Sequence, residues 1–365
     1  MNKIISEVMQ LVKPYTFKNV MKEVCKRDND VIVRPTLSCI CAADLRYYTG
    51  NRRQEALKKK LPMALLHEGI GIIDEDNECG YRKGERVVIV PNIPGYIHSE
   101  DKYPTPDDCC AACKNGIHFE NHCKNVHFLS SGFDGMLQSK MVQPALCVAK
   151  IPDEVSDEIA VLSELTTVSY NACYKAVYVE KLNSKSNVLI FGDGAVAYSL
   201  YCVLSHIFKL PKENIHVVGK HKDKLKYFEK SIIYILNQDE IPSGFSLAFE
   251  CVGGKGITQA VDIAITKVKP GGMIMLMGVC EDDIPINTRD VLEKGLTLMG
   301  SSRSSRINYK TVLEHMKDEE FQNMLSILNL NNHFYIKELT DLNLAFDFAA
   351  SKDYWGKVYL YINQE

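Results

Sequence analysis

The sequence of 365 residues predicts an α/β protein of two domains, one rich in β-strands and one built on a doubly wound parallel sheet. Its first 150 residues hold short apolar runs broken by turn residues, such as 31–35 and 86–91. After about residue 155, apolar strands alternate with helical stretches instead. The first pattern predicts a barrel or sandwich, and the second predicts right-handed βαβ units.

The elements of the α/β region can be located from their apolar runs. Strands are expected at 187–191, 215–219, 247–253, 272–278 and 296–300, with a helix over 195–208. Beyond about residue 305 the chain turns helical and ends in an apolar strand, 357–362, which we expect to pair with the first domain. The α/β domain is then an insertion. The predicted limits are 1–156 with 306–365 for the β-rich domain and 157–305 for the inserted one.

Composition limits the classes of function. With 46% hydrophobic and 24% charged residues the chain is of ordinary globular type, and a net charge of −3 argues against nucleic acid as a partner. No apolar run is long enough to span a bilayer, and Glu7 comes too early for a secretory signal. We therefore expect a cytoplasmic protein without a membrane partner. Its 13 cysteines are then expected to be reduced, either buried or binding metal.

A glycine-rich turn predicts the nucleotide site. Gly192-x-Gly194-x-x-Ala197 follows an apolar strand and opens a helix. Glycines at these places allow a tight turn and close approach of a pyrophosphate to the helix N-terminus, and the small alanine lets the helix pack on the strand. The motif alone is weak, but the strands that follow favour a dinucleotide.

The second strand of this region indicates which dinucleotide is bound. An acid about 20 residues after the glycines would bind the ribose hydroxyls of NAD. Here the strand ends in Lys220, His221 and Lys222, with no acid before Asp223. Basic side chains would attract a 2′-phosphate, so the sequence predicts a preference for NADPH.

Three separate segments carry ligands suited to a catalytic zinc ion. They supply Cys41, His67 with the adjacent Glu68, and Glu164. Zinc accepts thiolate, imidazole and carboxylate ligands in a tetrahedral site, and a catalytic site keeps one position open. Taken singly, each residue has a structural explanation, and their order along the chain relative to the glycine motif is what favours a metal site.

That order resembles the zinc-containing medium-chain dehydrogenases and reductases. Cys41-x-x-Asp44 is followed by His67-Glu68-Gly69, by 83–87, by Glu164 and by the glycine motif. Within that superfamily the chain is most similar to the ribulose-5-phosphate reductases, which supply ribitol 5-phosphate for CDP-ribitol, a precursor of teichoic acids in the cell wall and of some capsules. The stretches that carry this similarity are 31–35, 40–44, 46–50, 66–69, 249–254, 291–298 and 300–304.

The resemblance implies a fold and a reaction. The β-rich domain is expected to be GroES-like and the inserted domain to be a Rossmann fold binding NADP. The expected reaction is reduction of D-ribulose 5-phosphate to D-ribitol 5-phosphate by NADPH with zinc as Lewis acid. Cys41, His67 and Glu164 are the implied ligands, and Glu68 is either an exchangeable ligand or an acid behind the metal.

One departure from the wider family leaves the path of the proton open. Alcohol dehydrogenases commonly place a hydroxyl residue two positions after the metal-binding cysteine, where this chain has Ala43. The alkoxide must receive its proton by another route. Zinc-bound water, Glu68, Asp44 and Tyr47 are the candidates.

A second cysteine group resembles the structural zinc lobe of many medium-chain dehydrogenases. That lobe usually has four cysteines, and this chain offers Asp107, Cys110, Cys113 and Cys123 at comparable places. Cys109, His118 or His122 are alternatives to Asp107. A second zinc ion is expected here, although an unliganded thiol loop is the competing interpretation.

Residues near the metal cysteine are expected to bind the sugar phosphate. Arg46 and Tyr47 follow Cys41 closely, and Arg303 follows the strand ending at Gly300. Arginine can bind phosphate with two parallel hydrogen bonds. Solvated arginines without such a role are the alternative.

Two other functions fit part of the pattern. A polyol dehydrogenase for sorbitol or xylitol would share the ligands but would usually favour NAD. An NADPH-binding scaffold without chemistry would not need to keep the whole ligand set. The family further implies a homodimer joined through the apolar edge strand near Leu296. The pathway, and no residue, suggests a cytidylyltransferase partner.

Overall fold

The computed structural model describes residues 2–330 and 332–363. Contacts divide the chain into two compact units, residues 1–167 with 303–365 and residues 168–302. The first boundary falls within helix α7 (Ser163–Tyr178). None of the helices in the described residues combines the length and apolar character that crossing a bilayer requires.

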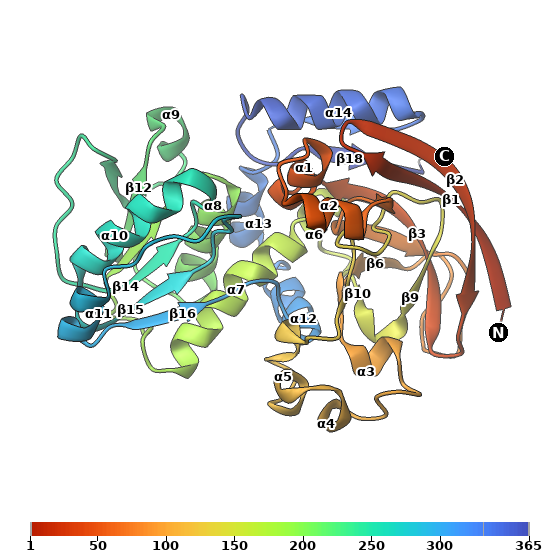
Figure 1. Cartoon of the computed structure of the whole chain (residues 1–365), viewed down its shortest axis with the longest axis horizontal. Helices are drawn as coiled ribbons and strands as arrows, with labels where there is room; N and C mark the ends of the chain where they lie inside the picture. The colour runs from red at the N-terminus through yellow and green to blue at the C-terminus, as the bar shows by residue number, and fades with distance from the viewer. Residues whose placement is uncertain (1, 331, 364–365) are drawn as a thin grey trace. The chain divides into compact units, whose positions relative to one another are not determined.

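The first unit is built on two β-sheets (Figure 1). The smaller has the order β2 (Thr16–Lys26), β1 (Asn2–Lys13) and β4 (Met63–Ala64). The larger runs β10 (Val148–Lys150), β6 (Arg86–Ile89), β5 (Glu68–Ile73), β3 (Asp30–Cys39), β18 (Tyr359–Tyr361) and β17 (His333–Tyr335), and β9 (Met141–Pro144) also pairs with β3. A short pair, β7 (Asn92–Ile93) and β8 (His127–Phe128), lies apart from both.

Strand β3 organises the larger sheet. Its residues are almost all buried, as expected of an apolar run flanked by strands on both edges. Cys39 at its end is opposite Glu68 on β5 and opposite Tyr359 on β18, both in antiparallel pairs. The expected pairing of the C-terminal strand with the β-rich domain is thereby confirmed. This register brings three remote segments together beside residue 41.

Short helices surround these sheets. Those of the first unit are α1 (Ala42–Tyr48), α2 (Gln54–Lys60), α3 (Gly95–His98), α4 (Pro106–Cys109), α5 (Ala111–Lys114), α6 (Asp157–Ala160), α12 (Arg306–His315), α13 (Glu319–Ser326) and α14 (Leu339–Ser351). Helix α1 starts directly after β3, with Cys41 as its N-cap. The position of the Cys41 backbone is therefore set by the end of β3.

The second unit is a six-stranded parallel sheet (Figure 1). Its order is β13 (Ile232–Ile235), β12 (Ile215–Gly219), β11 (Val188–Phe191), β14 (Phe245–Glu250), β15 (Val268–Leu276) and β16 (Thr297–Gly300). Its helices include α8 (Ala195–Cys202), α9 (Lys222–Leu225), α10 (Ile257–Lys267) and α11 (Thr288–Lys294). The order reverses between β11 and β14, which is where doubly wound sheets bind nucleotides. The predicted doubly wound fold is confirmed, and β13 is a strand that sequence patterning did not identify.

Candidate metal centre and cofactor-binding site

Three of the predicted metal ligands converge in the first unit. One ligand atom each from Cys41, His67 and Glu68 lies within 4.8 Å of the other two. Cys41 is held at the start of α1, while His67 and Glu68 lie where β5 begins. Leu66, just before them, has a φ of 74°, a left-handed conformation that is uncommon for leucine. Strain of this kind is typical of functional sites whose surroundings fix the backbone.

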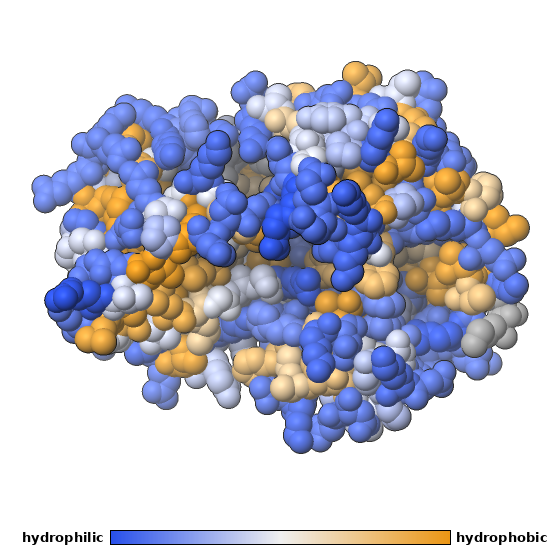
Figure 2. Space-filling view, in the orientation of Figure 1, coloured by the Kyte–Doolittle hydropathy of each residue, from blue (hydrophilic) through white to orange (hydrophobic). Residues whose placement is uncertain are grey.

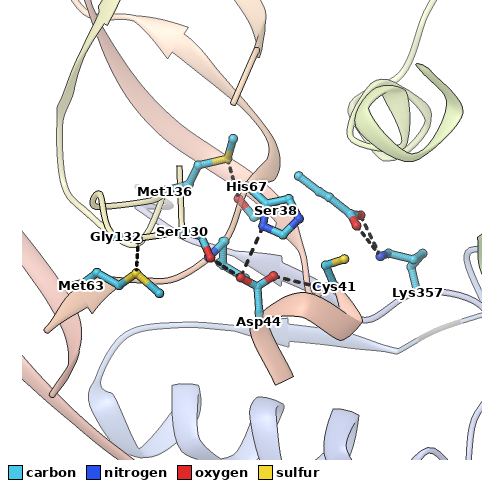
Figure 3. A network of polar contacts seen from close by, with 11 residues as sticks. Ser38, Cys41, Asp44, Met63, His67, Ser130, Gly132, Met136 and Lys357 are labelled. Atoms are coloured by element: carbon cyan, nitrogen blue, oxygen red, sulfur yellow. Dashed lines mark hydrogen bonds and ion pairs between the residues drawn. The ribbon is translucent and has the colours of Figure 1, made fainter. Parts of the chain in front are cut away.

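Asp44 lies beside His67 and Cys41 and orients them, and it is drawn below His67 in Figure 3. Its carboxylate is fully buried, accepts hydrogen bonds from the backbone N–H of Cys41 and of Leu66 at 3.1 Å each and from the Ser130 hydroxyl, and lies 3.4 Å from Nδ1 of His67. Burial by itself would raise the pKa of Asp44, but the charge of His67 and these hydrogen bonds lower it overall. A carboxylate behind the imidazole leaves Nε2 of His67 for a metal.

Glu164 and Lys357 complete the buried charges. Glu164 lies in the first turn of α7, and burial together with the charge of Glu68 raises its pKa to about 7. Its oxygens lie outside the 4.8 Å group of Cys41, His67 and Glu68. Lys357 Nζ lies 2.9 Å from Oε1 and 2.7 Å from Oε2 of Glu68.

The residues present fit a zinc ion. The described donors are one thiol, one imidazole and carboxylates, which is a set that zinc accepts. Burial alone would lower the pKa of His67, but the negative charges of Asp44 and Cys41 raise it well above its usual value. The site therefore attracts positive charge, and a divalent cation would balance the thiolate and the carboxylates that converge there.

The second cysteine group is assembled differently from the sequence-based expectation. Cys109, Cys110, Cys113 and Cys123 bring their sulfur atoms within 4.8 Å of one another. Asp107, which was expected in the first place, is exposed and lies outside the group, as do His118 and His122. Cys109 takes its place at the end of α4, directly before Cys110, whose extended backbone is the shared cap of α4 and α5.

The thiols of this lobe are in unequal environments. Burial alone would raise the pKa of Cys110, but backbone hydrogen bonds from Cys113 and Lys124 lower it to about 7. Burial raises the pKa of Cys113, and it raises that of Cys123 to about 11. Four clustered thiols are a donor set that zinc would stabilise as thiolates.

The glycine motif lies at the carboxyl end of β11. Gly192 has a φ of 130° and donates its N–H to the Val218 carbonyl at 2.9 Å. A Cβ at Gly192 would lie 3.4 Å from Ala197 Cβ, which is an ordinary van der Waals contact, so the positive φ rather than lack of space favours glycine here. Gly194 is the N-cap of α8, whose N-terminus can face a pyrophosphate.

Asp193 is a residue of this motif that sequence reasoning overlooked. Its Oδ2 accepts hydrogen bonds from the backbone N–H of Lys220 at 2.7 Å and of His221 at 2.8 Å, and it contacts His221 Nδ1 at 2.9 Å. The Asp193 carboxylate thus holds the backbone at the tip of β12 and also binds the imidazole of His221. The side chains of Lys220 and Lys222 remain exposed at that tip.

The predicted substrate residues have distinct surroundings. Tyr47 is buried one helical turn after Asp44. The guanidinium of Arg303 lies 4.7 Å from the centroid of the Phe128 ring, and that ring packs 5.4 Å from the His67 ring. Arg46 is half-buried on the same helix as Tyr47. Tyr47 and Arg303 are thus tied to the surroundings of His67 by described contacts.

Comparisons with known proteins agree with this geometry. The alcohol dehydrogenase GroES-like domain family matches residues 27–153, and the zinc-binding dehydrogenase family matches residues 215–318. Ribulose-5-phosphate reductase 1 of Staphylococcus aureus is 37% identical over 98% of this chain and 99% of its own length. The ribulose-5-phosphate reductase of Streptococcus pneumoniae is 35% identical over 94% of this chain and 96% of its own length.

A solved structure extends the similarity to the fold. The crystal structure of S. aureus TarJ in complex with NADPH is 32% identical, with a TM-score of 0.80 over 98% of this chain and 99% of that one. Similarity of this extent covers both units and both candidate sites. The chain belongs to the zinc-dependent alcohol dehydrogenase family with a GroES-like domain, and within it to the ribulose-5-phosphate reductases.

Proposed function

We propose that this protein reduces D-ribulose 5-phosphate to D-ribitol 5-phosphate with NADPH, as a zinc-dependent oxidoreductase. The observation that carries the proposal is the converging group of Cys41, His67 and Glu68 in a chain 37% identical to a ribulose-5-phosphate reductase. The basic tip at Lys220 and Lys222 supports NADPH as the hydride donor.

Each residue of the centre has a separate task in this proposal. Zinc, when bound, polarises the ketone carbonyl and stabilises the developing alkoxide. Cys41 and His67 would hold it together with Glu164 or Glu68. Asp44 keeps His67 in one orientation. Lys357 holds the Glu68 carboxylate by an ion pair, which favours Glu68 as an exchangeable rather than a permanent ligand.

The surroundings of the site narrow the routes for the proton. Asp44 already accepts three hydrogen bonds and its pKa is lowered by His67 despite burial, so it is a poor proton donor. The Tyr47 hydroxyl is buried without a hydrogen-bond partner in the described residues. Zinc-bound water, Glu68 and Tyr47 remain the candidate routes.

Oxidation of NADPH, followed by its absorbance, tests the function directly. Ribulose 5-phosphate should be reduced rapidly, and a zinc chelator should abolish turnover until zinc is restored. A polyol dehydrogenase would instead prefer xylulose or fructose with NADH. A scaffold would bind NADPH without oxidising it, and that result would overturn the proposed function.

We further propose a structural zinc ion held by Cys109, Cys110, Cys113 and Cys123. Their four converging sulfur atoms support it. Tetrahedral thiolate sites of this kind stabilise small lobes that have little hydrophobic core of their own. The four helical turns and the loops between residues 95 and 123 fit that description.

A homodimer in the cytoplasm is also proposed. Strand β16 is an edge of the described parallel sheet, and Leu298 and Met299 on it are only half-buried. Leu292 on the neighbouring α11 is 79% exposed, and Figure 2 shows hydrophobic surface in this region. A second copy would cover this edge by extending the sheet. A cytidylyltransferase partner remains a proposal from the pathway.

A further inference from the structure

A group of cations surrounds the side chain of Tyr47 in the first unit. The guanidinium of Arg52 lies 4.6 Å from the centroid of the Tyr47 ring, and Lys60 Nζ lies 5.9 Å from it. Tyr47 is 1% exposed, and its hydroxyl has no hydrogen-bond partner among the described residues. Leaving a buried hydroxyl unsatisfied costs free energy, which indicates that a ligand atom completes this place.

Arg303 joins the group from a remote part of the chain. Arg303 reaches the surroundings of His67 through the Phe128 ring, and burial lowers the pKa of its guanidinium. Its backbone has a φ of 59°, a left-handed conformation that is uncommon for arginine. Its guanidinium lies 4.7 Å from the centroid of the Phe128 ring. We call Tyr47, Arg52, Lys60 and Arg303 the Tyr47 cluster.

Two chains of contacts connect the Tyr47 cluster to the metal centre. In one, the Ser130 hydroxyl bonds to Asp44, and the next residue, Ser131, accepts a hydrogen bond from Lys60 Nζ at 2.8 Å. Asp44 and Tyr47 lie three residues apart on α1, so they share a helix face.

The other chain of contacts runs through aromatic rings. His67 packs on Phe128 at 5.4 Å, and Phe128 carries Arg303 at 4.7 Å. The cations are therefore within a few side-chain lengths of the ligand imidazole. They are not scattered over the surface of the unit.

We propose that the Tyr47 cluster is a phosphate-monoester subsite, which binds the phosphate of the substrate while its carbonyl faces the metal. This rests on the proposed function, in which the phosphate is carried by C5, itself three bonds from the reacting C2. Arg52 and Arg303 can each offer paired N–H donors, Lys60 adds a compact charge, and the Tyr47 hydroxyl donates one hydrogen bond. A dianion also relieves the mutual repulsion of the three cations.

The subsite gives the enzyme its selectivity for phosphorylated ketoses. An unphosphorylated ketose offers no dianion to these three side chains and no phosphate oxygen to the buried Tyr47 hydroxyl, so it should bind more weakly. Binding energy from the phosphate can be used to hold the carbonyl in place. The cluster thus distinguishes this chain from polyol dehydrogenases that share the same metal ligands.

The test compares the zinc-loaded wild type with Arg52→Ala and Lys60→Ala on two substrates. With NADPH saturating, kcat/KM for D-ribulose 5-phosphate should fall by about tenfold to a hundredfold in each variant, because a charge-assisted hydrogen bond is lost. kcat/KM for D-ribulose should not change. Lys58→Ala is the matched control, since Lys58 is exposed on the same helix, two residues from Lys60.

A conservative variant separates binding from packing. Tyr47→Phe keeps the ring on which Arg52 lies but removes the hydroxyl, so it should weaken the binding of D-ribitol 5-phosphate several-fold more than that of ribitol. Arg52→Lys should restore part of the loss seen in Arg52→Ala. Equal losses on both substrates would show a packing role, and no loss on either would show that the cluster binds no phosphate; either result overturns the proposal.

A binding measurement tests the phosphate subsite separately from the proposed reaction. Calorimetry would compare D-ribitol 5-phosphate, ribitol and inorganic phosphate on the NADP-bound protein. The subsite is supported if ribitol 5-phosphate binds more tightly than ribitol and Arg52→Ala weakens that binding. This holds even if ribulose 5-phosphate is not reduced, a result that would overturn only the proposed function. Equal binding of the two polyols overturns the subsite whatever the activity.

Discussion

The ammonium group of Lys357 lies 2.7 Å from one carboxylate oxygen of Glu68 and 2.9 Å from the other, although the two residues are 289 positions apart. Both side chains are buried, with 7% and 1% of their surfaces exposed. Burial alone would lower the pKa of Lys357, but the charge of Glu68 and the thiols nearby raise it. The C-terminal segment therefore fixes a carboxylate at the metal centre.

Removing one partner of this pair should destabilise the protein strongly. Lys357→Met leaves Glu68 as an uncompensated buried charge, and we expect the free energy of unfolding to fall by about 3–5 kcal/mol. Glu68→Gln added to that variant should recover much of the loss. Urea unfolding followed by fluorescence of Trp355, the single tryptophan, measures both effects. The exposed Lys337→Met is the control, and an equal change there would contradict the interpretation.

Asp44 should control how tightly zinc is held. Asp44→Asn removes the charge behind His67 but keeps the size of the side chain, so we expect zinc affinity to fall by about tenfold to a hundredfold. Competition with a chromogenic chelator measures the affinity. Retention of wild-type affinity would mean that Asp44 serves only to cap helix α1.

The cysteine lobe should determine how many zinc ions each chain binds. The wild type should contain two zinc ions per chain, and Cys109→Ser should lower this to one because a thiolate ligand is lost. Asp107→Ala, two residues away and exposed, should retain two. Metal analysis decides between them. One zinc ion per chain in the wild type, unchanged by Cys113→Ser, would remove the structural site.

The tip of β12 should set the choice of cofactor. Removing the exposed charges with Lys220→Ala and Lys222→Ala should raise KM for NADPH by about tenfold in the double variant and leave KM for NADH unchanged. Lys226→Ala, on the same short stretch, is the control. Equal catalytic efficiency of the wild type with NADH and NADPH would contradict the predicted preference.

His127 should make stability depend on pH. Its ring is stacked between those of His98 at 3.4 Å and Phe133 at 3.7 Å, and burial with the charge of His98 lowers its pKa to about 4. The unfolded chain, with a histidine pKa of about 6.5, then binds the proton more readily. The stabilising effect of neutral His127 is complete above about pH 6.5 and is lost as the pH falls toward 4.

The comparison with His127→Phe isolates this contribution. Between pH 6.5 and 4 the wild type should lose about 1–2 kcal/mol more than the variant, allowing for the partial exposure of the ring. Urea unfolding across that range measures both. Parallel stability curves would show that His127 is not the group responsible.

The sequence predicted most strongly where a local pattern fixes a local structure. Gly192, Gly194 and Ala197 form the expected turn, because a tight strand-to-helix connection has few chemical solutions. The pairing of the C-terminal strand followed from its apolar character. Strand β13 was not identified although Ile232 to Ile235 form an apolar run, and these residues are exposed to half-buried at the edge of the sheet.

Contacts between remote segments were beyond sequence reasoning. Asp193 is the variable position of the glycine motif, and only the approach of β12 to that loop gives its carboxylate two backbone N–H donors. Cys109 replaces Asp107 because of how the chain turns at Cys110. Residues two positions apart on a helix, such as Asp107 and Cys109, do not face the same way. Sequence spacing alone does not say which of the two faces the other cysteines.

By itself the sequence determined the two kinds of domain, the nucleotide turn and the chemical types of the ligands, because each is encoded by residues close together in the chain. Only the tertiary structure decided that Lys357 neutralises Glu68, that Arg52 and Lys60 meet at Tyr47, and that Arg303 packs on Phe128 beside His67. Those contacts depend on strand register and on long-range packing, in which a shift of one residue moves a side chain to the opposite face of a sheet.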